Sequence, residues 1–203
     1  MDPITTIALT LGVGWASGIN LYAAILTLGI MQASGAIVLP PGLEILSEPL
    51  VVVAAVFMYL VEFFADKVPG VDSGWDALHT FIRIPAGAVL AAAAIGPVDP
   101  GWMLAAGLVG GTLAAGTHAT KAGSRLLINA SPEPFSNWAA SIAEDVTVIA
   151  GLWLALKHPL MFIVLLALFV ALLAWLTPKL FRVLKRVAQK LFGRREPAPP
   201  SVA

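Results

Sequence analysis

The last apolar segment of the chain, residues 160–176, contains no charged side chain. An α-helix crosses the hydrocarbon core of a bilayer with about 20 mostly apolar residues, within a range of about 17–25. The chain is only 12% charged and 59% hydrophobic, whereas a soluble domain has about 25% charged residues. Because too few polar groups are present to cover a water-soluble globule, the sequence predicts an integral membrane protein.

Six apolar segments, the last included, are rich in alanine and leucine and show no strict alternation of polarity. A membrane β-barrel shows segments of about ten residues that do alternate, and a helix satisfies its own backbone hydrogen bonds in lipid. We therefore predict an all-α membrane protein with about six transmembrane helices. The segments are residues 4–34, 49–65, 83–98, 102–128, 135–156 and 159–176, and the short third one is expected to gain length from residues 75–82.

The ends of the chain and its residue types exclude some classes of site. No cysteine is present, so disulfides, thiolate metal sites and cysteine nucleophiles are excluded. The first residues carry no positive charge and lead into a glycine-rich apolar stretch without a convincing cleavage site. A secretory signal peptide starts with a positive region, so we expect the first apolar segment to be retained as a helix.

Lysine and arginine are distributed unevenly around the six predicted spans. With six spans both termini lie on the same side of the membrane. That side receives four cations of the loops and the seven cations of the tail, Lys179–Arg195, which makes eleven. The opposite side receives only Lys157. Because loops rich in lysine and arginine stay in the cytoplasm, we expect an inner (plasma) membrane protein with both termini cytoplasmic. The four loop cations are Lys67, Arg83, Lys121 and Arg125.

The tail is basic and has helical periodicity. Apolar residues recur at helical spacing over residues 178–195 while lysine and arginine fill the other face, a pattern typical of a helix lying on anionic lipid. It serves either as a topology anchor or in regulation or partner binding. Residues 196–203 are rich in proline and are predicted to be disordered. Residues 1–177 form the single transmembrane domain in this interpretation.

An internal repeat is visible when the chain is shifted against itself. The two halves, residues 4–98 and 102–177, would each hold three spans, and an odd number per half forces them into opposite orientations, as in many secondary transporters. A shift of 98 aligns Gly12, Ala16, Gly18, Ala24, Leu28 and Ile30 with Gly110, Ala114, Gly116, Ala122, Leu126 and Ile128, and a shift of 85 aligns Glu48, Pro49, Ala54, Ala55, Val61 and Ala65 with Glu133, Pro134, Ala139, Ala140, Val146 and Ala150.

Two matching glycine-rich segments, residues 12–18 and 107–116, have two interpretations. In inverted-repeat transporters, interrupted helices meet at the membrane midplane and form the binding site. Small residues four apart also allow helices to pack closely without any site. Both interpretations stay open at the level of sequence.

Ionisable and amide side chains inside the predicted spans are costly in lipid and usually mark a site or a pairing. Asn20 and His118 fall on each other in the repeat, and Glu144 and Asp145 lie midway along the fifth segment. Lys121 and Arg125 lie one turn apart and are candidate partners for the acids.

The densest cluster of charge surrounds the turn after the second segment. Four carboxylates, those of Glu62, Asp66, Asp72 and Asp76, lie there with Lys67, His79 and Arg83. The cluster is a structural network of ion pairs and helix caps, a site for a coupling cation or proton, or a metal-dependent catalytic site. The spacing matches no zincin, EF-hand or nucleotide loop, and the three histidines form no metal-binding pair.

The run from Asp66 to Asp76, Asp-Lys-Val-Pro-Gly-Val-Asp-Ser-Gly-Trp-Asp, and the run Gly18-Ile-Asn-Leu-Tyr22 resemble a known family. It is the family of bacterial and plastid membrane proteins called domain of unknown function 4126, and the resemblance covers about residues 4–177. It implies a multipass membrane protein and the importance of Asp66, Asp72 and Asp76, and it names no substrate.

The leading functional hypothesis is a small inverted-repeat transporter or channel for a small solute or ion, with no cofactor, no nucleic acid partner and no catalytic residue. A non-catalytic membrane scaffold that binds anionic lipid and an intramembrane enzyme acting on a lipid are the alternatives, and a chain this small favours a homodimer. Glu62, Asp66, Asp72 and Asp76 would bind the coupling cation or proton, Asn20, His118, Glu144 and Asp145 would join them, and Lys67, Arg83, Lys121 and Arg125 would balance the charge.

Overall fold

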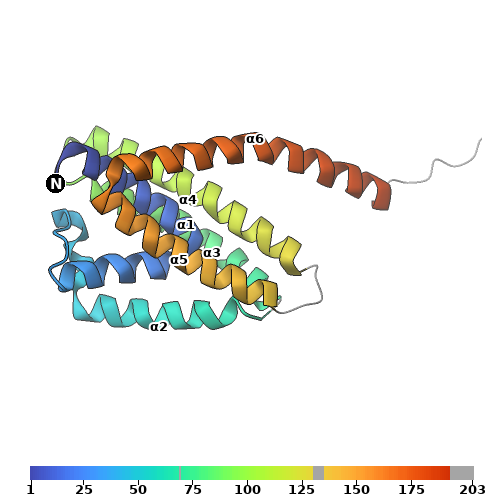
Figure 1. Ribbon diagram of the computed structural model, residues 1–203, viewed down its shortest axis with the longest axis horizontal. Helices are drawn as coiled ribbons and strands as arrows, with labels where there is room; N and C mark the ends of the chain where they lie inside the picture. The colour runs from blue at the N-terminus through green and yellow to red at the C-terminus, as the bar shows by residue number, and fades with distance from the viewer. Residues whose placement is uncertain (69, 130–134, 193–203) are drawn as a thin grey trace, which may run out of the picture. The chain divides into compact units, whose positions relative to one another are not determined.

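The computed structural model describes residues 1–68, 70–129 and 135–192, and every regular element in these ranges is a helix. The predicted disordered tail, residues 196–203, lies outside the described residues. The all-helical prediction is therefore confirmed (Figure 1). The elements are α1 (Pro3–Ala33), the 3-10 helix η1 (Pro41–Ser47), α2 (Pro49–Ala65), α3 (Val71–Ala94), α4 (Pro100–Asn129), α5 (Phe135–Lys157) and α6 (Pro159–Phe192).

The chain forms two compact units, Met1–Ile163 and Val164–Ala203. The second unit holds most of α6, which runs as one helix from Pro159 to Phe192 and so includes most of the basic segment. In this unit the Lys179 ammonium lies 3.0 Å from the centre of the Trp175 ring, a cation–π contact. All of the predicted site residues belong to the first unit.

Helix α1 turns back on itself. Thirty-one helical residues in a straight line would extend about 46 Å, yet Met1 and Asp2 at one end and Ala36–Leu39 just beyond the other line the same cleft. The backbone leaves helical geometry at Asn20, with φ −147° and ψ 99°. We call the two arms, residues 3–19 and 21–33, and the turn between them the α1 hairpin, with Asn20 at its tip.

The side chain of Asn20 explains why the second arm begins there. Its Oδ1 accepts a hydrogen bond of 2.9 Å from the backbone N–H of Ala23, and its Nδ2 donates one of 2.8 Å to Asp145. An asparagine in extended geometry that accepts from the third N–H after it is a favoured start for a helix. The tip is buried, with Asn20 only 2% exposed. Because the interior supplies no water to the first N–H groups of the second arm, the Asn20 side chain supplies the hydrogen bond instead.

The first arm of the hairpin packs against α3, α4 and α5, and glycine permits its close approach to α4. A Cβ added to Gly14 would lie 2.6 Å from the Cα of Gly110, and one added to Gly18 would overlap Thr117 and the Ala114 carbonyl. Close packing of small residues therefore accounts for these glycines. Helix α4 itself runs without a break through residues 107–116, so only the first of the two glycine-rich segments lies beside an interruption.

The composition of the helices indicates a membrane-embedded protein. Helices α1, α3 and α5 are long and apolar enough to cross a bilayer, and η1 with α2, bent by 68°, forms a fourth candidate. Large apolar side chains are exposed along their lengths, as on Phe57, Phe81 and Trp153. Six crossings and an inverted repeat remain predictions, and the return of α1 removes the basis for counting residues 4–34 as one straight crossing. Helix α3 begins at Val71, so residues 75–82 extend the short third segment as expected.

Candidate functional site

Seven charged side chains from four helices meet in the interior of the first unit. We call this group the charge network: Glu62 from α2, Asp66 at its C-terminal end, Asp76 and Arg83 from α3, Lys121 and Arg125 from α4, and Glu144 from α5. The side chain of Glu144 is 16% exposed, and the other six are at most 3% exposed.

Lys121 lies at the centre of the network. Its ammonium nitrogen is 2.9 Å from Asp66, 3.3 Å from Glu62, 3.3 Å from Glu144 and 3.8 Å from Asp76. An ammonium group has three donors and cannot bond four carboxylates equally well. Lys121 therefore holds together acids that come from three different elements and the end of α2.

The two arginines complete the network from either side of the lysine. Arg83 contacts Glu62 at 2.6 Å and Asp76 at 3.2 Å. Arg125 bonds Glu144 through two nitrogens at 2.7 and 3.1 Å and also lies 3.3 Å from Asp66. Bidentate pairing of a guanidinium with a carboxylate is among the stronger and more directional ion pairs, so Arg125 fixes α5 against α4.

The network has more acids than bases. Four carboxylates against three cations leave a formal excess of one negative charge when all groups are ionised. Three carboxylate oxygens, Oε2 of Glu62, Oδ1 of Asp66 and Oδ2 of Asp76, are buried without a hydrogen-bond partner. Buried polar atoms are normally paired, so these oxygens are free to accept a proton or a water molecule.

The acids of the network are separated from one another by basic side chains. Among the described residues no group of three or more acidic or histidine side chains is arranged to hold a metal ion. The basic side chains lie between the acids instead, because Lys121 contacts all four of them. The acids and bases of the cluster are therefore interleaved as ion pairs.

His118 on α4 connects the network to the hairpin. Its Nδ1 lies 3.2 Å from Nη1 of Arg83, and its Nε2 lies 2.8 Å from the hydroxyl of Thr80. A guanidinium only donates hydrogen bonds, so Nδ1 must accept and we assign the proton to Nε2. The same Arg83 nitrogen lies 3.5 Å from the carbonyl oxygen of Gly18, next to the hairpin tip.

Asp145 lies at the hairpin tip, separate from the ion pairs. Its Oδ1 accepts from Asn20 at 2.8 Å and its Oδ2 accepts from the hydroxyl of Tyr59 at 2.8 Å. Asp145 is 7% exposed. The adjacent residue Glu144 turns toward Arg125, so the two neighbouring acids of α5 serve different groups.

Asp72 and Lys67, which the sequence places in the same acidic turn, lie outside the network. Both oxygens of Asp72 accept from Nδ2 of Asn129 at 2.8 Å, and Oδ1 also accepts from the backbone of Gly70. The Lys67 ammonium lies 2.8 Å from the centre of the Phe63 ring and donates to the Phe63 carbonyl. Burial of the Lys67 side chain lowers its pKa.

The structure therefore divides the twelve predicted residues into three places. Seven form the charge network with His118 beside it, Asn20 and Asp145 meet at the hairpin tip, and Asp72 and Lys67 lie apart. Sequence reasoning missed four polar partners, although amides and hydroxyls within apolar segments are themselves a signal. These are Tyr59, Thr80, Asn129 and Asn137, whose backbone carbonyl and Oδ1 accept from Arg125.

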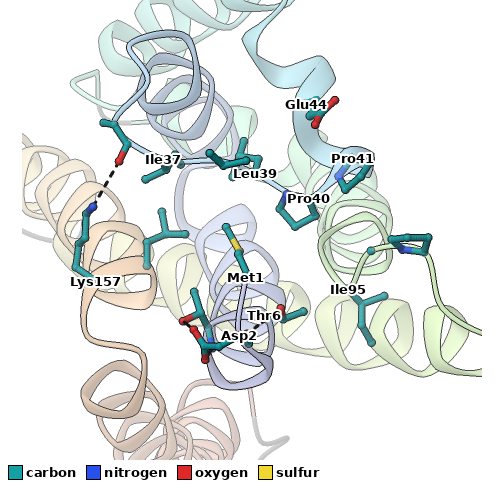
Figure 2. Close-up of a pocket in the computed structure, with 16 residues that line it drawn as sticks. Met1, Asp2, Thr6, Ile37, Leu39, Pro40, Pro41, Glu44, Ile95 and Lys157 are labelled. Atoms are coloured by element: carbon teal, nitrogen blue, oxygen red, sulfur yellow. Dashed lines mark hydrogen bonds between the residues drawn. The ribbon is translucent and has the colours of Figure 1, made fainter.

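A cleft of about 720 Å³ lies at the other end of the first unit, and none of the predicted site residues lines it. Figure 2 shows Lys157 donating to a backbone carbonyl, that of Ala36, across its rim at 3.4 Å. Asp2 caps the first arm of α1 by accepting from the backbone of Ile4 and Thr5 at 3.0 Å. The hydrogen bond from the Thr5 hydroxyl lowers the pKa of Asp2.

Comparison with known proteins gives a family and no function. No curated protein and no solved structure matches the chain. A family model described as "Domain of unknown function (DUF4126)" matches residues 7–179. This range includes all but the first four residues of the α1 hairpin, the whole charge network and Asp145. The chain belongs to the DUF4126 family of proteins.

Proposed function

We propose that this protein is a proton-coupled membrane transporter or channel for a small solute or ion. The observation that carries the proposal is the charge network beside the hairpin tip, where four carboxylates face three cations and three carboxylate oxygens have no partner. A purely structural network gains most from matched charges, since each unpaired buried charge is costly. The excess acid supports a role in which one proton is taken up and released.

The physical reason for proton binding is the environment of the acids. Burial and nearby like charges both favour the neutral form of a carboxyl group. Because Lys121 contacts all four acids, a proton bound by any one of them changes the charge balance of the whole network. A proton taken up from water would bring the network to three negative and three positive charges.

The α1 hairpin supports a transport role because it ends inside the protein. In several transporter folds, broken helices place their half-helix ends at the binding site near the midplane. Here the start of the second arm faces Asp145 and the end of the first arm offers the Gly18 carbonyl to Arg83. Both contacts connect the hairpin tip with ionisable side chains, and of these Asp145 can change its charge.

The packing beyond the tip also fits a movable region. Within the described residues, α2 makes almost no close backbone approach to α4 or α5. Glu62 and Asp66 reach Lys121 across that separation with their side chains. Helices held by ion pairs separate when those pairs exchange partners, whereas interlocked backbones, such as Gly14 against Gly110, do not.

For the membrane orientation, we propose that the network end faces the cytoplasm of an inner membrane. Lys67, Lys121 and Arg125 lie toward that end, and Lys157 lies at the opposite cleft. Both ends of α1 line the cleft as well. The proposal therefore places the N-terminus outside, in place of the cytoplasmic N-terminus that six straight crossings imply.

The test is proton uptake into sealed liposomes that contain the purified protein and a pH-sensitive dye, driven by a potassium diffusion potential. The wild type should acidify the lumen faster than empty liposomes. Glu62→Gln and Asp66→Asn should abolish the difference, because each leaves three negative and three positive charges and removes the extra acid. Glu48→Gln is the matched control, since Glu48 is exposed and its side chain makes no cap bond.

The outcomes separate function from folding. Both variants should elute like the wild type in detergent, because the loss of one acid balances the network. Unchanged proton uptake in well-folded Glu62→Gln and Asp66→Asn would remove these residues from the mechanism. Uptake by the wild type no faster than by empty liposomes would contradict the function itself.

A second candidate is a membrane scaffold that binds anionic lipid or a partner through the basic tail. The observation in its favour is that α6 continues as a helix past Lys179 and Arg182 to Phe192. This role predicts no proton uptake and a stable partner, or a second copy of the chain, in detergent pull-downs. A chain that ends at residue 177 should lose that partner and keep the charge network.

A further inference from the structure

Asp145 differs from every acid of the charge network in its partners. Each network acid has a lysine or arginine nitrogen within 4.0 Å, whereas Asp145 has none among the described residues. Its two oxygens accept only from the neutral donors of Asn20 and Tyr59, each at 2.8 Å. Asp145 is nevertheless buried, with only 7% of its surface exposed, and it lies on a helix that is apolar enough to cross a bilayer.

A carboxylate in such a position is stable in only two ways. It keeps its charge if its hydrogen bonds and distant cations compensate for burial, or it takes up a proton and becomes neutral. Two neutral donors supply part of that compensation, and Lys67 and Lys121 attract it only from a distance. Small changes around Asp145 are therefore sufficient to move it between its two states.

The bond from Asn20 links that choice to the backbone of α1. The same amide that donates to Asp145 caps the second arm through its oxygen, at Ala23. Hydrogen bonds to an ionised acceptor are shorter and stronger than those to a neutral one. The charged form of Asp145 thus holds the hairpin tip in the observed position more firmly than the protonated form does.

We infer that Asp145 binds a second proton, coupled to that of the charge network, and that Asn20 transmits the protonation of Asp145 to the α1 hairpin. This inference rests on the proposed proton-coupled function and adds a specific site to it. The proton arrives from water on one side, adds to a carboxylate oxygen of Asp145 and weakens the bond from Asn20. It leaves when the tip, no longer held, exposes Asp145 to the other side.

The surroundings of Asp145 set the pH at which this happens. Glu62 repels the charged form of Asp145, and Lys67 and Lys121 attract it. Uptake of a proton by the charge network reduces that repulsion, so the two sites are coupled. The titratable and charged groups around Asp145 are Tyr59 and Glu62 on α2, Lys67 in the following loop and Lys121 on α4. Its chain neighbour Glu144 turns toward Arg125.

The test measures protonation directly, by infrared difference spectroscopy of the protein in lipid during a pH titration. The protonated carboxyl signal that grows as the pH falls includes the network acids, and its component from Asp145 should be missing in Asp145→Asn and persist in Glu48→Gln. Asp145→Asn should also lose proton uptake in liposomes. A band and an uptake rate that Asp145→Asn leaves unchanged would overturn the assignment.

A conservative variant keeps the test valid if Asp145→Asn does not fold. Tyr59→Phe removes one donor to Asp145 and leaves every charge in place. A carboxylate that loses a donor binds its proton more tightly, so the midpoints of both the band and the uptake should move to higher pH together. Unmoved midpoints would overturn the assignment, whereas absent uptake in the wild type with an intact Asp145 band would contradict only the transport function.

Discussion

Helix α1 turns back at Asn20, whereas α4 runs straight from Pro100 to Asn129, although the two share glycine and alanine positions at a shift of 98. The residue at the break differs. Asn20 caps a new helix and bonds Asp145, while His118, its counterpart, stays helical and reaches sideways to Arg83 and Thr80. A short amide can replace the backbone partner of a helix start. An imidazole at the same place extends past the backbone to its neighbours.

The two helices also divide the electrostatic roles. Helix α4 supplies Lys121 and Arg125 to the charge network, and α1 supplies no charged side chain, since the first lysine or arginine of the chain is Lys67. Similar patterns of small residues thus occur in α4, which is continuous and charged, and in the α1 hairpin, which carries no charge and ends beside α4. The difference shows that shared packing residues do not require a shared backbone path.

The largest expected effect lies in the charged half of α4. Lys121→Met leaves four buried acids against two arginines and should lower the free energy of unfolding by about 3–5 kcal/mol, the usual cost of breaking a buried pair. Thermal unfolding in detergent, followed by tryptophan fluorescence, measures it. Lys157→Met, at an exposed site, is the control. Equal loss of stability in both variants would mean that Lys121 in the network stabilises the fold no more than an exposed lysine does.

The aligned glycines Gly18 and Gly116 should respond in opposite ways. Gly18→Ala forces the hairpin tip away from Thr117 and should cost about 3 kcal/mol. Gly116 has open space around it, so Gly116→Ala should be neutral or stabilise the helix by up to about 1 kcal/mol. The same unfolding measurement compares them. A repeat with equivalent packing would predict equal effects.

The tip of α1 can be separated into its two interactions. Asn20→Ala removes both the cap and the bond to Asp145 and should cost about 2 kcal/mol. Asn20→Ser retains an oxygen that can cap and loses the donor to Asp145. Serine should therefore recover about 1 kcal/mol of that loss. If serine is no better than alanine in thermal unfolding, the cap does not stabilise the second arm.

The smallest effect is a pH dependence at the first turn of α1. The hydrogen bond from Thr5 lowers the pKa of Asp2, so its stabilising effect is present above the ordinary aspartate pKa and is lost as the pH falls through the lowered value. Asp2→Asn should slightly lower the unfolding temperature near pH 7 and flatten its decline with acid, so that the two proteins converge at low pH. An identical acid decline in both proteins would contradict this role.

Local patterns in the sequence predicted much of the fold. The apolar runs located each α-helix but not the 3-10 helix η1, and the second and fifth segments start at the residues where α2 and α5 begin. Spacing of three or four residues placed Glu62 with Asp66, and Lys121 with Arg125, on common helix faces. These predictions depend on contacts within one helix, which a sequence contains in full.

The α1 hairpin could not be predicted in the same way. Residues 4–34 have the length and apolarity of a single crossing, and the bond that fixes the break joins residues 125 positions apart. The charge bias gave no help, because residues 1–66 contain no lysine or arginine and the positive-inside rule cannot place them. The position of Asp72 also depends on a contact between distant residues. The sequence grouped Asp72 with Asp66, whereas the hydrogen bond from Asn129 holds Asp72 outside the charge network.

The path of α1 through the membrane is tested most directly by its two ends. The chain has no cysteine, so single cysteines at Ile4, Ser34 and Gly74, all exposed, can be labelled with a membrane-impermeant maleimide in sealed vesicles. The hairpin predicts that Ile4→Cys and Ser34→Cys react from the same side and Gly74→Cys from the other. Labelling of Ile4→Cys and Ser34→Cys from opposite sides would show that α1 crosses the bilayer and would contradict the hairpin.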